Sequence, residues 1–91
     1  MSIYKNYKNK LLDFYNEIKV KNLSPTTVRT YINDHTDYLL RDMDYYEVTK
    51  GNISKKTYER YKFLLINFSI KLHDKYARFY SKKQRDSNKS N

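Results

Sequence analysis

The sequence predicts an all-α protein, a compact bundle of three long helices plus one short helix. The 91 residues include one Gly and one Pro, too few for sandwiches and barrels, which need turn residues roughly every 8–12 positions. Apolar residues instead recur at spacings of three and four over three long segments, the period of an amphipathic helix. A chain of this length has room for a single core. We therefore expect one helical domain over residues 1–80, followed by a tail.

The first helix is predicted from Tyr4 to Ile18. Its apolar stripe consists of Tyr4, Tyr7, Leu11, Phe14, Tyr15 and Ile18. All six positions fall on one side of a helix and so define the face that packs on the rest of the bundle.

The second helix is predicted from Pro25 to about Arg41. Ser24 can accept a hydrogen bond from the first turn, and Pro25 at the first helical position loses no backbone bond. Leu23 and Val28 have the spacing of a hydrophobic staple. The expected inner face holds Val28, Ile32, His35 and Leu39, with Tyr31 and Tyr38 flanking it.

The next segment predicts a short helix over residues 42–48, capped by Asp44, and a turn at Gly51. The helix-start pattern then repeats thirty residues on, with Ser54 as the cap and Ile53 and Tyr58 as the staple. Either a duplication or the shared need of two helices for a cap and a staple explains the repeat. The third helix carries a six-turn stripe of Tyr58, Tyr61, Leu65, Phe68, Leu72, Tyr76 and Phe79. Residues 81–91 contain no apolar side chain and are predicted to be a disordered basic tail.

The charge of the chain indicates a polyanionic partner. Nineteen basic and ten acidic residues give a net charge of +9, which favours nucleic acid or anionic lipid as a ligand. The charge is uneven, because half of the acidic residues lie between Asp34 and Glu47. We expect duplex DNA to contact the starts of the second and third helices. This hypothesis requires the two helix starts to lie next to each other. The candidates are Thr26, Thr27, Arg29, Thr30, Lys55, Lys56 and Arg60. The alternative is that these charges only solvate outer faces.

The sequence lacks the residue patterns of catalytic and metal sites. There is no Cys, and the two His residues have no second ligand at helical spacing. No phosphate-binding glycine loop or nucleophile elbow is present, so we expect neither an enzyme nor a cofactor. The longest apolar run, from Phe63 to Ile66, is too short to span a membrane. A cytoplasmic protein is therefore expected.

Two motifs resemble the N-terminal core-binding domain of tyrosine recombinases, the phage integrase family. They are Leu23-Ser24-Pro25-Thr26-Thr27-Val28-Arg29-Thr30-Tyr31 and Ser54-Lys55-Lys56-Thr57-Tyr58-Glu59-Arg60-Tyr61. The resemblance covers residues 5–77 and implies a SAM-like helical bundle that clamps duplex DNA. The family's catalytic domain, with its nucleophilic Tyr, has no counterpart in these 91 residues. The resemblance thus implies a non-catalytic accessory or regulatory protein of a mobile element such as a phage.

Two further functions compete with DNA binding. A protein-interaction subunit would dock on a larger recombinase, repressor or polymerase through Tyr38, Tyr45 and Tyr46, beside the acidic segment. A protein of the anionic membrane surface would use the first helix and the basic tail. The membrane hypothesis is the weakest, since the first helix interleaves polar residues with its lysines and its apolar face is needed for the core.

Overall fold

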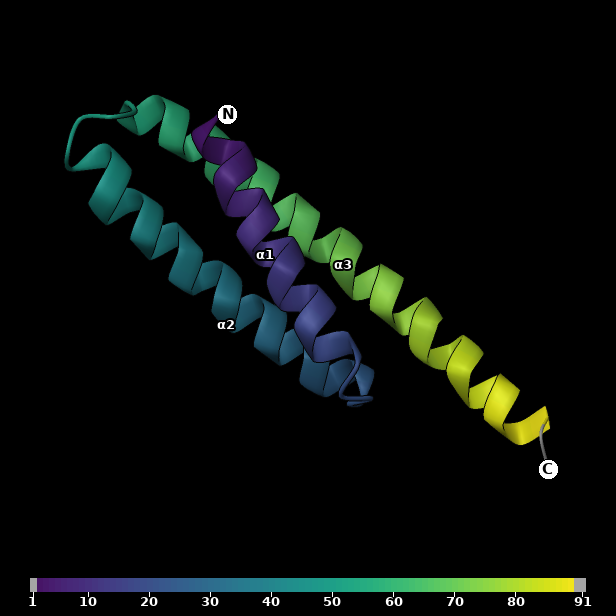
Figure 1. The fold of residues 1–91 in the computed structure, drawn as a ribbon. Coiled ribbons are helices and arrows are strands. Elements are labelled where there is room, and N and C mark those ends of the chain that lie inside the picture. Colours follow the sequence, from purple (N-terminus) through teal and green to yellow (C-terminus); the bar gives the residue numbers. More distant parts are fainter. Residues whose placement is uncertain (1, 90–91) are drawn as a thin grey trace.

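A computed structural model describes the backbone of residues 2–89 and the side chains of residues 2–84. The elements are α1 (Ile3–Lys19), α2 (Pro25–Met43), the π-helical turn η1 (Asp44–Val48) and α3 (Lys55–Lys89). Residues 2–89 contain no β-strand, which confirms the all-α prediction. Figure 1 shows α1 running in the same direction as α3, with α2 running back along both. The start of α2 and the start of α3 therefore lie at opposite ends of the bundle.

Side-chain caps fix where the three helices begin. The Oγ atoms of Ser2, Ser24 and Ser54 accept hydrogen bonds from the backbone N–H groups of the residues three positions later, at 3.1, 3.3 and 3.1 Å. Such a bond satisfies a donor that has no partner within the helix. Ser24 and Ser54 were both predicted as caps, and Pro25 occupies the first turn as predicted. Gly51 adopts φ +82° in the turn before α3, a conformation that glycine tolerates best.

The predicted apolar stripes face one another and form most of the core, but Leu40 and Met43 are buried outside the predicted stripe of α2, and His35, predicted on its inner face, is only half-buried. Tyr7, Leu11, Tyr15 and Ile18 of α1 are buried, together with the equivalent residues of the other helices. The buried core residues of α2 and α3 are Val28, Ile32, Leu39, Leu40, Met43, Tyr58, Leu65, Leu72 and Tyr76. Three tyrosine hydroxyls make long-range hydrogen bonds, which join α1 to α2, α3 to α2, and α3 to the connection between α1 and α2. Tyr7 donates to Asp42 at 2.8 Å, Tyr58 donates to the Leu40 carbonyl at 3.3 Å, and Tyr76 donates to the Leu23 carbonyl.

Two local predictions differ from the structure. Residues 44–48 form a π-helical turn that continues α2, so Asp44 does not cap a separate helix. Its carbonyl instead accepts from Thr49 N–H at 3.0 Å, five residues on. The tail was predicted to be disordered, whereas α3 continues to Lys89. Adding residues to a helix that already exists costs little, and Lys, Gln and Arg favour helix. Residues 90 and 91 lie outside the described part of the chain.

The long α3 makes the molecule elongated, with extents of 58, 22 and 16 Å. Phe79 and Tyr80 are the last residues that pack on the core. The side chains of residues 81–84 are exposed, and the end of α3 projects beyond the bundle (Figure 1).

Candidate nucleic-acid interface

The structure does not bring the predicted DNA-binding residues together. Thr26, Thr27, Arg29 and Thr30 lie at the start of α2, and Lys55, Lys56 and Arg60 lie at the start of α3. Arg29 shares a cavity of about 240 Å³ with His73 and Ala77, far along α3. Lys55 precedes His73 by eighteen positions, or about 27 Å of helix at 1.5 Å per residue. The expectation that Arg29 and the basic residues of α3's first turns are neighbours is wrong, because α2 and α3 are antiparallel.

Several of these side chains also have local structural partners. Thr27 Oγ1 is hydrogen-bonded to Ser24 Oγ at 2.9 Å, and Thr30 Oγ1 donates to the Thr26 carbonyl at 3.2 Å. Lys55 Nζ lies 4.0 Å from an Asp44 carboxylate oxygen. Lys56, Arg60 and Arg29 are exposed. The two predicted sets thus form small, separate basic areas at the two ends of the bundle.

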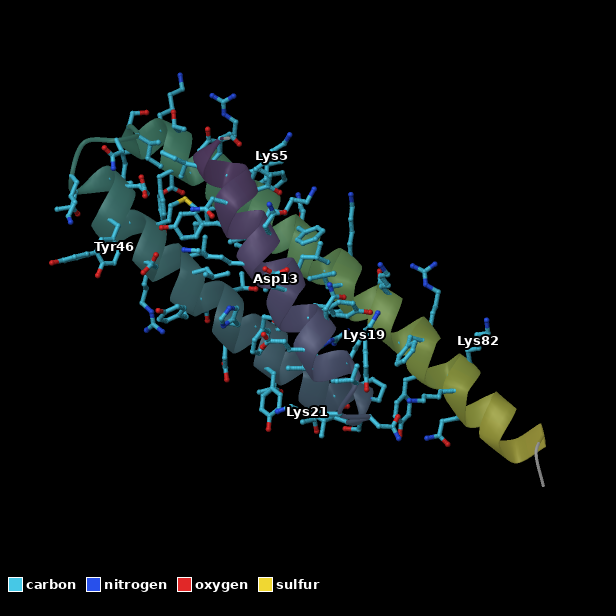
Figure 2. The ribbon with its side chains drawn as sticks, in the orientation of Figure 1. Lys5, Asp13, Lys19, Lys21, Tyr46 and Lys82 are labelled. Carbon is cyan, nitrogen blue, oxygen red and sulfur yellow. The ribbon has the colours of Figure 1, made fainter. Side chains whose placement is uncertain are left out.

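A basic surface that the sequence analysis did not identify follows the contact between α1 and α3. We call Lys8, Lys19, Lys71 and Lys75 the basic seam. Lys8 of α1 lies with its Nζ 4.9 Å from the ring centre of Phe68 on α3, and Lys75 of α3 reaches to 5.9 Å from Tyr15 on α1. Lys19 Nζ is 5.8 Å from both Tyr15 and Phe79. Figure 2 shows Lys19 between the two helices.

One end of the seam, at Lys8 and Lys71, is an apolar hollow bordered by lysines. Lys8 and Lys71 line a cavity of about 390 Å³. Its other lining residues are Tyr4, Leu64, Asn67, Phe68 and Ile70. None of these described lining residues is a carboxylate. The lysine stems cover apolar surface while their ammonium groups remain available to an anion.

The seam has a signal in the sequence, in the spacing of the basic residues. Lys71, Lys75, Arg78 and Lys82 follow one another at intervals of four, three and four, and so share one side of α3. Lys8 and Lys19 are eleven residues apart, close to three full turns. The apolar periodicity that predicts the helices does not include these basic residues, so it does not indicate the seam.

Three acidic residues lie on the other side of α1, in its groove with α2. Asp13, Glu17 and Asp42 line this groove, together with Lys10. Tyr7 donates its hydroxyl to Asp42, and burial together with this bond raises the pKa of Tyr7 well above its ordinary value. One side of α1 therefore borders the basic seam with α3, and the other borders the acidic groove with α2.

The tyrosines predicted to bind a partner are exposed, as that hypothesis requires. Tyr38, Tyr45 and Tyr46 are 56, 61 and 47 % exposed. Tyr45 and Tyr46 form an edge-to-face pair with ring centres 4.8 Å apart, and Lys50 Nζ lies 5.0 Å from the Tyr46 ring. Tyr38 is instead part of the groove between α1 and α2. The three side chains thus belong to two different surfaces.

Comparison of the chain with protein-family models, with curated proteins and with solved structures gives no match. Within residues 2–89, no group of three or more His, Cys, Asp or Glu side chains is placed to hold a metal ion. None of the described helices combines the length and the apolar character needed to cross a bilayer.

Proposed function

We propose that the protein is a non-catalytic protein that binds duplex DNA through the basic seam. The observation that carries the proposal is the gathering of Lys8, Lys19, Lys71 and Lys75 along one helix–helix contact. Neutralising phosphates releases condensed counterions, which supplies most of the sequence-independent affinity for DNA. A row of lysines that borders a hollow without carboxylates in its lining is suited to that task.

The length of the seam suits a DNA backbone. Lys8 and Lys19 are about 16 Å apart along α1 at 1.5 Å per residue, which is the axial rise of about five base pairs. Lys71 and Lys75 are one helical turn apart, about 6 Å. Arg29, which lies beside His73 and Ala77 in the contact between α2 and α3, and the Lys55 group at the start of α3 lie off the seam and are not counted in this footprint.

The biological role in the proposal is that of an accessory or regulatory protein of a mobile element, acting in the cytoplasm. It is supported by the resemblance of residues 23–31 and 54–61 to the integrase core-binding domain. The SAM-like subtype of the helical fold belongs to the same proposal. DNA binding without strand cleavage is the activity expected of such a piece.

The test compares two full-length variants with equal loss of charge. Lys71→Ala/Lys75→Ala removes two seam lysines, whereas Lys10→Ala/Lys50→Ala removes two lysines beside the acidic groove and Tyr46. Affinity for a duplex is measured by fluorescence anisotropy between 50 and 200 mM salt. With four phosphates engaged, the parent loses affinity on the order of a hundredfold over this range, with a log–log slope of about −3.6. The seam variant should reduce the slope to about −1.8.

The control variant shows whether DNA affinity depends on the seam lysines or only on the net charge of the protein. Lys10→Ala/Lys50→Ala should keep the parent's slope, because neither lysine lies on the seam. Equal slopes for the two variants would contradict the proposal, and so would full affinity of the seam variant.

A second candidate function is that of a protein-interaction subunit, favoured by the exposed pair Tyr45 and Tyr46. Exposed aromatic side chains are enriched in protein interfaces. This surface lies on η1, apart from the seam between α1 and α3. Both functions can therefore operate in one molecule.

A further inference from the structure

The groove between α1 and α2 has aromatic walls and remains open to solvent. It has a volume of about 400 Å³, and Phe14, His35, Tyr38 and Leu39 form its apolar part. The rings of Phe14 and His35 stack with centres 4.1 Å apart and planes 10° apart, and His35 and Tyr38 continue the stack at 5.8 Å and 24°. Tyr38 is 56 % exposed. The stack thus leads from the half-buried Phe14 to the exposed Tyr38, whose ring can contact a ligand at the surface.

The charge around this groove selects a cationic occupant. Asp13, Glu17 and Asp42 line it against the single cation Lys10. In residues 2–84 the one ion pair joins Lys55 to Asp44, so these three carboxylates have no cationic partner. Tyr7 donates a hydrogen bond to Asp42. Lysine and arginine side chains match both properties, because their stems and the guanidinium plane pack on aromatic rings while their charges pair with carboxylates.

The same chain carries such a segment at the end of α3. Residues 81–89 hold Lys82, Lys83, Arg85 and Lys89 against Asp86, and the side chains of residues 81–84 are exposed. The segment lies in a continuous helix that points away from the bundle (Figure 1). It therefore cannot reach the groove of its own molecule.

We propose that the basic end of α3 from one copy docks in the acidic aromatic groove of a second copy. The contact is heterologous: each molecule contributes a groove to one neighbour and a helix end to another, so copies add head to tail. The net charge of +9 on each copy is screened beyond about 8 Å at physiological salt, whereas the local charges pair at contact distance. The contact leaves the seam between α1 and α3 free, and it does not depend on DNA binding.

Two full-length variants test the contact without nucleic acid. The groove variant Asp13→Asn/Glu17→Gln removes the acidic lining, and the tail variant Lys82→Gln/Lys83→Gln/Arg85→Gln removes the basic end. Sedimentation equilibrium of the parent should show an average mass that rises with concentration and falls again at high salt. Each variant alone should remain monomeric. The control Asp34→Asn/Asp37→Asn changes two exposed acids outside the groove and should associate like the parent.

Mixing the two variants gives the decisive measurement. The tail variant retains an intact groove and the groove variant retains an intact helix end, so the mixture should form a one-to-one dimer with twice the monomer mass. A mixture that stays monomeric, or a parent that is monomeric at all concentrations, would overturn the proposal. Association of the tail variant by itself would do the same, because another surface would then join the copies. Thermal unfolding checks that each variant is folded, and the seam's salt slope tests DNA binding separately.

Discussion

Changing Tyr76 to Phe removes one buried hydroxyl and leaves the surrounding ring contacts in place. Tyr76 is 1 % exposed, and its hydroxyl donates to the Leu23 carbonyl, 53 positions away in the connection between α1 and α2. Burial raises the pKa of this tyrosine above its ordinary value of 10, at which the hydroxyl is already protonated and able to donate at neutral pH. Without it, the Leu23 carbonyl loses its donor inside the protein. A buried group left without its partner costs about 1–3 kcal/mol.

The loss is measured by urea unfolding followed by circular dichroism. A loss of this size is a large fraction of the roughly 5–15 kcal/mol that stabilises a typical domain. Each 1 kcal/mol of lost unfolding free energy lowers the Tm by roughly 4–8 °C in a chain of this size. The matched control is Tyr80→Phe, one turn further along α3. Tyr80 is half-buried with its ring centre 6.1 Å from that of Tyr76, and its hydroxyl has no hydrogen bond to any described residue. Its effect should stay within about 0.5 kcal/mol. Equal midpoints for Tyr76→Phe and Tyr80→Phe would refute the assignment of stability to the long-range bond.

Three further predictions follow from the fold. Gly51→Ala should lower the unfolding free energy by roughly 1 kcal/mol, because φ is +82° and an alanine is strained there. An added Cβ would meet nothing within 4 Å, so the strain of the backbone is the whole effect. Urea midpoints measure it. Burial is the largest cause that lowers the pKa of His35 and His73 from 6.5. The unfolded chain therefore binds protons more readily than the folded chain, and stability should fall as the pH drops below about 6.5. The urea midpoint should be lower at pH 5.5 than at pH 7.5, and this difference should be smaller in a His35→Asn/His73→Phe variant. Tyr45→Ala/Tyr46→Ala should leave DNA affinity unchanged while weakening a copurifying protein partner; loss of both together would contradict separate surfaces.

The sequence by itself determined the three long helices and the residues at which the second and third begin. The caps at Ser24 and Ser54 involve an N–H three residues away, and the apolar stripes follow from the helical period alone. Such features depend on neighbours in the chain, so they can be read before any tertiary contact is known. The same stripes predicted most of the core, because a helix with one apolar face must bury that face; Leu40 and Met43 of α2 were not among the predicted residues.

Only the tertiary structure decided which side chains meet across helices. Two capped helix starts look equivalent in sequence, but the antiparallel course of α2 and α3 places Arg29 beside His73 and far from Lys55. The same packing collects Lys8 and Lys71 at one contact of α1 and Asp13 and Asp42 at the other. Helical periodicity orders residues around a single axis and contains no information on the direction or rotation of the neighbouring helices. Those are fixed by how the buried side chains of the three helices fit together, and with them the separation of basic and acidic surfaces on which the proposed functions depend.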